Sequence, residues 1–413
     1  MLAKLNALRF RVNLWEHAFV HQDSPLYDAL LPHAGQYKVF GGLVPDFSRA
    51  AAADAFAEYH RQALIGQGVD AFKLDECDSS DYTGAWSFPN SDTFPSGMDG
   101  EQMHSLLGVL YQKTLLEAFA RAGKNTYGQA RASHALAAPL PFALYSDLYD
   151  HKVFIRGVVN AGFSGLLWTP EVRQCDSEED LLRRLQGVVF SAQALINGWM
   201  IPHPPWMQWD RDKNIAGEFL PDWRALTERC RAILEMRMRL IPYLYASFAE
   251  YRRSGLPPVR AMVMDYPDDP ETYALDSQYM LGQSLLVAPV TAGEDARDIY
   301  LPASGWYDFW DNTRYEGGRT IRYAAGADTI PVFVKSGALL PLAEPVAQVD
   351  EQTRFTVAVR RYGGRAGAFT LYEDDEANTA VHLFCDENGE GSVRREGDGA
   401  GSRYAITEWI SIV

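Results

Sequence analysis

The sequence predicts an α/β protein: an incomplete (β/α)8-type TIM barrel, followed by C-terminal antiparallel β-sandwich domains. In the first half, short β-rich runs alternate with helical patterns, which is typical of parallel strands joined by crossover helices. A long helical pattern then follows. From Pro257 onward the sequence changes to short strands separated by proline and glycine, as in antiparallel β-sandwiches. A chain of 413 residues, 47% of them hydrophobic, can bury the large cores that such domains need.

The barrel prediction rests on six short β-rich runs and the helices between them. The predicted strands are Phe10–Trp15, Val69–Asp75, Asn125–Arg131, Phe142–Ser146, Gly165–Trp168 and Ala192–Gly198. The predicted helices include Ala50–Gln67, Gly100–Arg121 and Ser177–Phe190, the last with a serine and two glutamates at its start. Six such units fill about 215 residues, whereas a closed eight-unit barrel needs about 250. Two units are therefore expected to be missing.

The second half predicts one helix and several strands. The helix begins after Asp222 as N-cap, is kinked at Pro242 and ends near Gly255. The strands are predicted at Ser284–Val290, Gly305–Trp310, Ile330–Val334 and Phe369–Tyr372, and the charged, glycine-rich segment Asp386–Arg403 predicts little order. The expected domains are an incomplete barrel (1–220), a linking helix (221–255), a proximal β-sandwich (256–345) and a distal, incomplete β domain (346–413).

Charge and composition exclude several classes of partner. The net charge of −16 repels phosphate backbones and anionic lipid, so we expect neither nucleic acid nor a membrane as partner. The most apolar stretch, Val188–Pro202, contains polar residues and is shorter than a bilayer span, and the N-terminus lacks the apolar core of a signal peptide. A cytoplasmic location is expected. The four cysteines have no zinc-ligand spacing, so we expect reduced, mostly buried thiols and neither a metal nor a cofactor.

Carboxylates and tryptophans gather at the ends of the predicted strands, where the βα loops of a barrel carry its chemistry. The carboxylates are Glu16, Asp75, Glu76, Asp78, Asp147 and Glu171, with Lys73 and Arg131 beside them; the tryptophans are Trp15, Trp86, Trp168, Trp199, Trp206 and Trp209. Taken singly, such an acid is more often a helix cap and such a tryptophan more often packing. Together they favour a carbohydrate site, because flat aromatic faces and carboxylates match the apolar faces and hydroxyl edges of sugars. The expected partner is a small oligosaccharide or glycoside, and the sequence leaves a homo-oligomer open.

Several motifs resemble those of glycoside hydrolase family 31, the retaining α-glucosidases, α-xylosidases and their relatives. The stretch GVDAFKLD at residues 68–75 resembles the nucleophile strand of this family, YGQARAS at 127–133 its next strand, and YSD at 145–147 the segment with its acid/base. Further similar stretches are LIPYLY (240–245), DYPDDP (265–270), LGQSLLVAP (281–289), WYDFW (306–310) and IPVFV (330–334). The resemblance implies a barrel that binds sugar, with Asp75 as nucleophile and Asp147 as general acid/base. It also implies that Arg131 reaches the sugar.

The chain departs from the family pattern in two places. The resemblance implies an N-terminal β-sandwich and two barrel strands ahead of Phe10–Trp15, which this sequence does not contain. Where most members carry a Trp-Ser-His-Asp motif that binds sugar hydroxyls, this chain has Trp168, Thr169, Pro170 and Glu171. Because proline cannot donate a side-chain hydrogen bond and glutamate is longer than aspartate, we expect an altered sugar preference, with α-galactoside ahead of α-glucoside and α-xyloside.

The chemistry of the residues supports a double-displacement mechanism, which needs two carboxyl groups about 5–5.5 Å apart. Asp75 is predicted to be held ionised by the neighbouring Lys73, and Asp147 is predicted to lie in a less polar setting that raises its pKa. Lys73, Arg131, Glu171, Trp15 and Trp168 are predicted to bind the sugar. Two alternatives stay open: Glu171 as the acid in place of Asp147, and a non-catalytic carbohydrate-binding barrel or inactive fragment.

Overall fold

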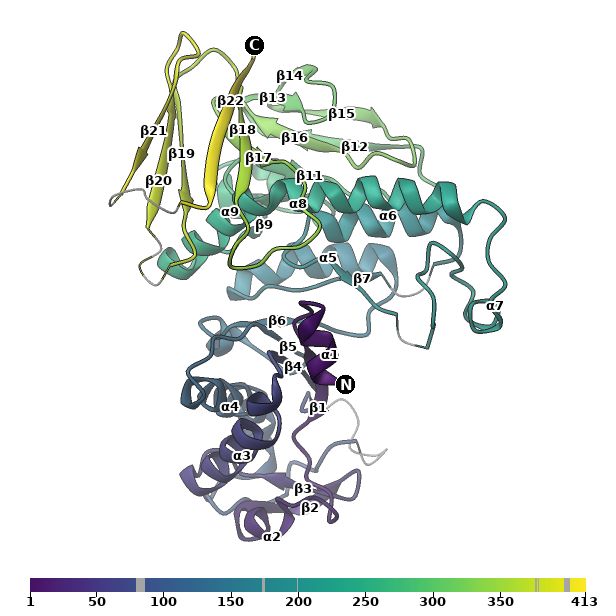
Figure 1. Ribbon diagram of the computed structural model, residues 1–413, viewed down its shortest axis with the longest axis vertical. Coiled ribbons are helices and arrows are strands. Elements are labelled where there is room, and N and C mark those ends of the chain that lie inside the picture. Colours follow the sequence, from purple (N-terminus) through teal and green to yellow (C-terminus); the bar gives the residue numbers. More distant parts are fainter. Residues whose placement is uncertain (79–85, 173–174, 199, 376, 378, 397–401) are drawn as a thin grey trace. The chain divides into compact units, whose positions relative to one another are not determined.

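The computed structural model describes residues 1–413 except 79–85, 173–174, 199, 376, 378 and 397–401 (Figure 1). The chain forms two compact units, Met1–Ser146 and Asp147–Val413, each described by itself below. The boundary at residue 146 falls inside the predicted barrel segment 1–220. The four predicted domain ranges stay a prediction.

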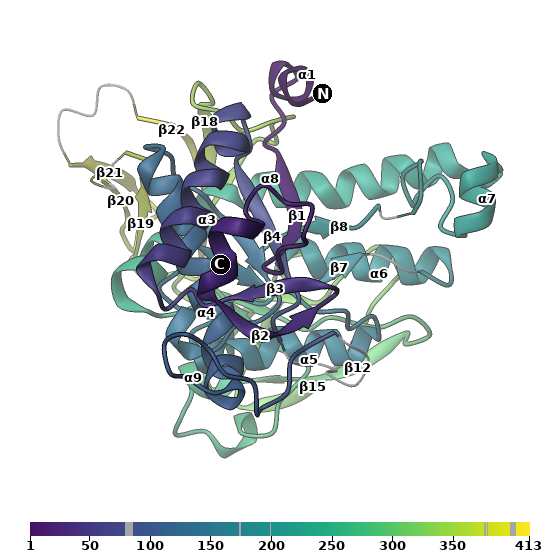
Figure 2. The same cartoon turned by 90° about the horizontal axis from the view of Figure 1, so that it is seen from below.

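The first unit is built on a parallel four-stranded sheet in the order β1-β4-β5-β6. Its strands are β1 (Asn13–His17), β4 (Ala71–Asp75), β5 (Gly128–Ala130) and β6 (Phe142–Leu144). Helices α3 (Ala50–Ala63) and α4 (Gly100–Arg121) pack together on one side of this sheet (Figure 2). The remaining elements are α1 (Leu2–Ala7), α2 (Tyr27–Leu30) and the hairpin of β2 (Ala34–Val39) and β3 (Gly42–Pro45).

Side-chain alternation along β4 explains how this sheet is held. Phe72 and Leu74 are buried in a core shared with the two long helices, while Lys73 and Asp75 are half-buried on the opposite face. Helix α4 begins at a capping box in which Asp99 accepts from the backbone N–H of Gln102 and the Gln102 side chain accepts from that of Asp99. The face that carries Lys73 and Asp75 is therefore left for the site.

The second unit begins with helices and two very short strands. They are α5 (His151–Ala161), β7 (Glu171–Val172), α6 (Glu178–Val189), β8 (Leu195–Ile196), α7 (Arg211–Ala216) and α8 (Trp223–Ser254). Strands β7 and β8 pair in parallel, and α6 lies beside α8 (Figures 1 and 2). Helix α8 continues through Pro242 as one element of 32 residues and ends at Gly255, whose φ of 78° is a conformation that glycine adopts without strain.

In the described residues, the β-rich part of the second unit contains four sheets. A six-stranded sheet has the order β14-β13-β16-β11-β10-β9, and β12 pairs with β15. Two three-stranded sheets follow, β17-β18-β22 and β19-β20-β21. The bounds are α9 (Met262–Asp265), β9 (Val259–Ala261), β10 (Tyr279–Leu281), β11 (Leu285–Val287), β12 (Ala296–Leu301), β13 (Gly305–Asp308), β14 (Arg314–Glu316), β15 (Arg319–Ala324), β16 (Val332–Lys335), β17 (Leu339–Ala343), β18 (Phe355–Tyr362), β19 (Gly367–Tyr372), β20 (Ala380–Cys385), β21 (Gly391–Arg395) and β22 (Tyr404–Ile412).

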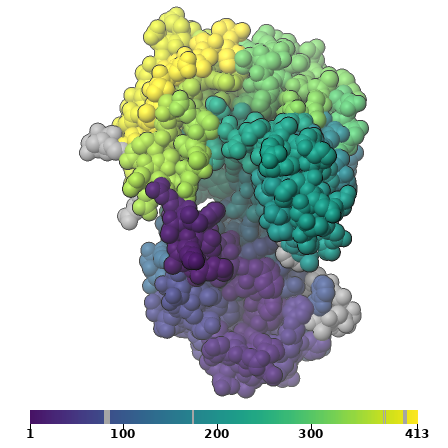
Figure 3. All heavy atoms as spheres, turned by 45° about the vertical axis from the view of Figure 1, so that its right-hand side comes forward, coloured from purple at the N-terminus to yellow at the C-terminus, as the bar shows by residue number. Residues whose placement is uncertain are grey.

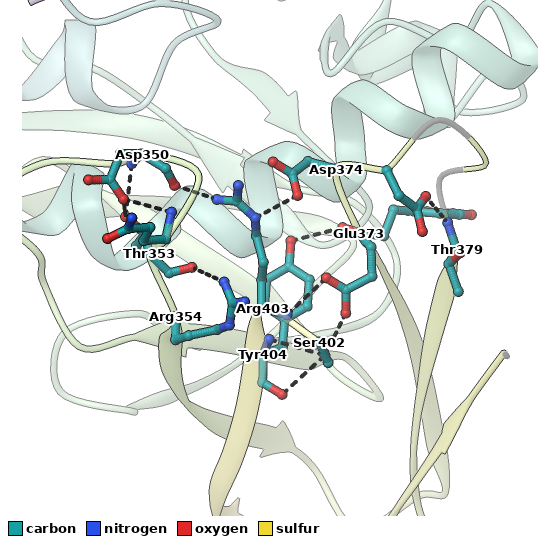
Figure 4. A network of polar contacts seen from close by, with 12 residues as sticks. Asp350, Thr353, Arg354, Glu373, Asp374, Thr379, Ser402, Arg403 and Tyr404 are labelled. Atoms are coloured by element: carbon teal, nitrogen blue, oxygen red, sulfur yellow. Dashed lines mark hydrogen bonds and ion pairs between the residues drawn. The ribbon is translucent and has the colours of Figure 1, made fainter. Parts of the chain in front are cut away.

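A polar network anchors the start of β22 (Figure 4). The Arg403 guanidinium lies 2.5 Å from Asp374 and donates to the carbonyl of Asp350 at 2.7 Å. The backbone N–H of Arg403 donates to Glu373, which also accepts from the hydroxyl of Ser402. Strand β22, which pairs in parallel with β18, is thereby fixed at its first residues.

Some predicted elements differ from the structure. The fifth barrel strand, predicted at Gly165–Trp168, is wrong, because the paired residues are Glu171–Val172 of β7. Helix α5 was not among the predicted helices. Asp222 precedes α8, but among the described residues its carboxylate caps no backbone N–H of the first turn. Strand β21 lies inside the segment 386–403 that was predicted to have little order, and residues 397–401 lie outside the described residues.

Two further sequence predictions concern the thiols and membrane spans. Cys77, Cys175, Cys230 and Cys385 are all free and buried, as predicted. None of the helices in the described ranges is both long and apolar enough to cross a bilayer.

Candidate active site

The site in the first unit is built on one face of the parallel sheet. Strands β1 and β4 are in register, with Trp15 opposite Lys73 and His17 opposite Asp75. Because neighbouring parallel strands point matched residues to the same side, all four side chains share one face. Arg131 and Tyr145 follow β5 and β6, and their backbone N–H groups continue the ladder to Leu74 and Ala130. The sheet therefore collects side chains that are far apart in sequence.

Asp75 is surrounded by hydrogen-bond donors. Its carboxylate accepts from the indole N–H of Trp15 at 2.6 Å and from the backbone N–H of Glu76 at 2.8 Å, and the nearby Tyr145 hydroxyl also favours its ionised form. Partial burial by itself would raise the pKa of Asp75, but these hydrogen bonds and the charge of Arg131 outweigh it and hold that pKa below its usual value. Asp75 is therefore ionised at neutral pH.

Arg131 is the cation that bridges Asp75, the last residue of β4, and Asp78, which follows the strand. Its guanidinium donates to Asp78 at 2.8 Å and to Asp75 at 3.4 Å. We predicted this electrostatic role for Lys73, whose ammonium group lies 4.1 Å from the centre of the Tyr145 ring. An arginine can serve two carboxylates and still present further N–H groups, because its fork carries five donors.

The chain turns sharply directly after Asp75. Glu76 and Cys77 have φ values of 58° and 64°, a left-handed conformation that costs non-glycine residues free energy. Such strain persists where the surrounding structure enforces it, and it concentrates at functional sites. Here the turn places the backbone N–H of Glu76 on the Asp75 carboxylate.

Glu16 was predicted among the strand-end carboxylates of the site, and the structure contradicts this. It lies within β1 between Trp15 and His17, so it points to the opposite face of the sheet. There its carboxylate lies 2.9 Å from Nε2 of the buried His60 and accepts from Tyr111 at 2.7 Å. Glu16 therefore supports β1 from behind.

Sequence reasoning missed two aromatic residues near Asp75, His17 and Phe40. The His17 ring lies 5.5 Å from Trp15 and 5.6 Å from Phe40, and Phe40 lies 6.3 Å from the exposed Trp86. Burial lowers the pKa of His17, although the charges of Glu16 and Asp75 act against this. The signal for His17 was its position two residues after Trp15. Phe40, in the β2–β3 turn, carried no such signal.

The second unit holds Asp147 and Glu171. Asp147 is exposed and accepts a hydrogen bond from Tyr149 at 2.6 Å, so the less polar setting predicted for it is wrong. Leu148, part of that predicted setting, is itself 45% exposed. Glu171 is buried in β7 and accepts from the side chain of Asn197 at 2.6 Å. Glu171 is thus the more enclosed of these two acids.

The remaining tryptophans differ in their surroundings. Trp168, which was predicted to line the sugar pocket, is buried against α5, beside Phe154 and Gly157. Trp206 and Trp209 are partly buried, whereas Trp199 lies outside the described residues.

Within the described part of the chain, no group of three or more histidine, cysteine, aspartate or glutamate residues has the arrangement to hold a metal ion.

Replacement of Trp15 by phenylalanine tests how Asp75 is kept ionised. Trp15→Phe keeps a ring but removes the N–H that donates to Asp75, so the pKa of Asp75 should rise by about one unit. Because that pKa lies below its usual value, the acidic limb of kcat/KM should move to higher pH. The carboxyl carbon chemical shift of Asp75 reports the same change without turnover. Trp86→Phe is the matched control, and an equal shift in both variants would contradict the assignment.

Comparison with family models identifies the chain. Residues 1–247 match the model of the glycosyl hydrolases family 31 TIM-barrel domain, and residues 255–340 match that of the family 31 C-terminal domain. The chain belongs to glycoside hydrolase family 31. The predicted family is confirmed, and so is the order of a TIM-barrel domain followed by β-rich domains.

Curated relatives and solved structures agree with this membership of family 31. An isomaltosyltransferase of Sporosarcina globispora is 30% identical over 75% of the chain and 29% of the relative. An α-xylosidase of Emericella nidulans is 28% identical over 83% of the chain and 45% of the relative. The chain thus spans less than half the length of these curated relatives. The α-xylosidase structure from Xanthomonas citri matches with a TM-score of 0.82 and 23% identity, over 100% of this chain and 49% of that one. A dextranase structure from Flavobacterium johnsoniae matches with a TM-score of 0.80 and 24% identity, over 96% of this chain and 54% of that one.

Proposed function

We propose that this chain carries the catalytic residues of a retaining exo-α-glycosidase that hydrolyses terminal α-linked hexosides. The observation that carries the proposal is Asp75, which ends a barrel strand and is kept ionised by Trp15, Tyr145 and Arg131. A family 31 chain with an ionised carboxylate at the end of this strand has the nucleophile that double displacement requires. The names of the relatives, an α-xylosidase and an isomaltosyltransferase, support α-glycoside chemistry.

In the proposed mechanism Asp75 attacks the anomeric carbon and forms a glycosyl ester. Asp147 donates a proton to the leaving oxygen, then removes a proton from the water that hydrolyses the ester. The Tyr149 hydroxyl, which donates to Asp147 at 2.6 Å, would orient the carboxyl group for this transfer. Two inversions at one carbon retain the α configuration.

Four further residues are proposed to bind the sugar, and Trp168 is proposed to support one of them. Trp15 and Arg131 already contact the nucleophile, and Lys73 lies on the same sheet face, so these three would surround the reacting ring. Glu171 would accept from a hydroxyl through a carboxylate that Asn197 orients. Trp168 would act from its buried position by shaping the segment that leads to Glu171.

The substrate is proposed to be an oligosaccharide or glycoside with a terminal α-galactosyl or α-glucosyl unit. The preference for galactose rests on Pro170 and Glu171, which stand where most family members carry His-Asp. Glucose is supported by the relatives, among them an α-glucosidase of Bacillus thermoamyloliquefaciens that is 28% identical over 57% of this chain, and by the dextranase structure, which was solved with isomaltotriose. A displaced hydroxyl leaves buried polar groups unpaired at a cost of about 1–3 kcal/mol, enough to separate the two epimers.

The experiment compares kcat/KM of the chain on 4-nitrophenyl α-galactoside, α-glucoside and α-xyloside. We expect hydrolysis with retention and about a tenfold or greater preference for the galactoside over the glucoside. An equal or higher value on the glucoside would refute the galactoside preference but leave the mechanism intact. Binding of sugars without hydrolysis of any of the three would refute the proposed enzyme and favour a carbohydrate-binding barrel.

A further inference from the structure

The second unit contains an open pocket outside the candidate active site. It has a volume of about 480 Å³ and lies between α8, the loop after β13 and the outer face of the sheet β17-β18-β22. In the space-filling view, teal helical segments meet the green to yellow β-rich segments on this unit (Figure 3). A volume of this size is typical of small-molecule sites. None of the proposed sugar-binding or catalytic residues lines it.

Trp310 forms the aromatic wall of this pocket and is held rigidly. Its indole N–H donates to the carbonyl of Ile330 at 2.7 Å, and its backbone N–H donates to Asp308 at 2.7 Å. Phe309 and Phe190 contact the ring edge to face, with centroids 4.9 and 6.3 Å away. The ring is nevertheless 38% exposed. A fixed aromatic face is thus presented to the pocket, with its polar atom already satisfied.

Charged side chains of both signs surround this aromatic face. The pocket is lined by Arg239 of α8, Glu344 after β17, Arg360 of β18 and Glu408 of β22. Within the described part of the chain, none of these four side chains takes part in an ion pair. The guanidinium groups supply hydrogen-bond donors and the carboxylates supply acceptors. Since two cations and two anions balance, a phosphate or an amine would meet repulsion as well as attraction.

A neutral, polyhydroxylated ring with one apolar face matches this chemistry best. Its C–H face would stack on the exposed indole, and its hydroxyls would pair with both kinds of charged group. We infer that this pocket is a second, non-catalytic saccharide-binding site centred on Trp310. The anchoring of β22 by Arg403 keeps the strand that carries Glu408 in place.

A smaller cavity, also lined by Trp310, lies along α8. This cavity has a volume of about 210 Å³ and shares Trp310 and Met236 with the larger pocket. It is lined further along α8 by Ile233 and Ala232 and is mainly apolar. The two volumes share this tryptophan as a lining residue, so the Trp310→Ala variant described next changes both.

The test measures the binding of isomaltotriose by calorimetry to a chain whose candidate active site is disabled by Trp15→Ala and Asp75→Ala. We expect binding to persist in this chain and to weaken about tenfold or more when Trp310→Ala is added. Glu344→Ala and Glu408→Ala, at exposed positions where folding is little affected, should each weaken it as well. Trp223→Ala, a partly buried tryptophan of α8 that does not line the pocket, is the matched control.

Three results would overturn the inference. One is the absence of isomaltotriose binding in the disabled chain, and another is binding that neither Trp310→Ala nor the two glutamate variants change. The third is a concentration-dependent dimer in sedimentation that Trp310→Ala abolishes, because the pocket would then be covered by a second copy of the chain. Hydrolysis of aryl α-glycosides by the unchanged chain is measured separately, so failure of the proposed enzyme is distinguished from failure of this site.

Discussion

Asp75→Asn is expected to lower the turnover of an aryl α-glycoside by several orders of magnitude. The amide is nearly isosteric with the carboxylate, yet it carries no negative charge and cannot form the glycosyl ester. Trp15, Tyr145 and Arg131 now surround a carboxylate and would instead face a neutral group, so the site also loses its electrostatic balance. Because the Asp75 carboxylate is needed for the chemical step and contributes less to substrate binding, kcat should fall far more than KM changes.

A 5-fluoroglycosyl fluoride tests the same assignment by trapping the ester. Mass spectrometry of the digested parent chain should find the label on Asp75. Asp78→Asn is the matched control, because Asp78 also bonds Arg131 but is not proposed to attack the sugar. A label on Asp78 or on any other carboxylate would contradict the assignment of Asp75.

The sheet of the first unit was predictable because its signals are local. Short apolar runs that end in charged residues gave β4 and β6, and the parallel order followed from the helices between strands. Side-chain alternation also requires Lys73 and Asp75, which are two residues apart on one strand, to share a face. The alternation of β1 should likewise have excluded Glu16, which lies one residue from Trp15 and therefore points to His60.

The partners of Asp75 could not be read from the sequence. Lys73 is its neighbour along the strand, but the ion pair in the structure is to Arg131, which is 56 residues away and is brought near Asp75 by the pairing of β4 with β5. Tyr145, which directly follows β6, is brought near Asp75 by the pairing of β5 with β6. Such contacts depend on strand register, which a sequence pattern specifies only to within a residue or two.

The second unit was harder to predict where its strands are very short. Strand β7 has two residues, fewer than any alternation pattern needs. The strand was therefore predicted in the more apolar stretch before it, Gly165–Trp168. That stretch ends at Trp168, whose burial against Gly157 of α5 depends on a helix that was not predicted. A tryptophan at a strand end was therefore interpreted as a sugar platform when it packs a helix.

Asp147→Ala is expected to separate substrates by their leaving groups. A general acid contributes about 10²–10⁴-fold to the rate where the leaving oxygen needs a proton. The variant should therefore lose most of its kcat/KM on alkyl glycosides and disaccharides but retain kcat/KM on activated aryl glycosides, whose leaving groups depart without protonation. With the activated substrates the ester on Asp75 should accumulate, because the group that activates water is missing as well.

Azide tests the second half of this role. It needs no general base, and it should restore turnover of Asp147→Ala and give the α-glycosyl azide, whose retained configuration shows that the ester was formed first. Tyr149→Phe, which removes the hydroxyl that donates to Asp147, should keep most of the activity and show no azide rescue.

Glu171→Ala decides between the two candidate acids. Glu171 is enclosed in β7 and bonded to Asn197, so its loss should raise KM and weaken sugar binding equally for good and poor leaving groups. A dependence on the leaving group together with rescue by azide in Glu171→Ala, and their absence in Asp147→Ala, would transfer the acid/base role to Glu171. The nucleophile would remain Asp75 in either case, because the label on the trapped ester does not depend on which acid protonates the leaving oxygen.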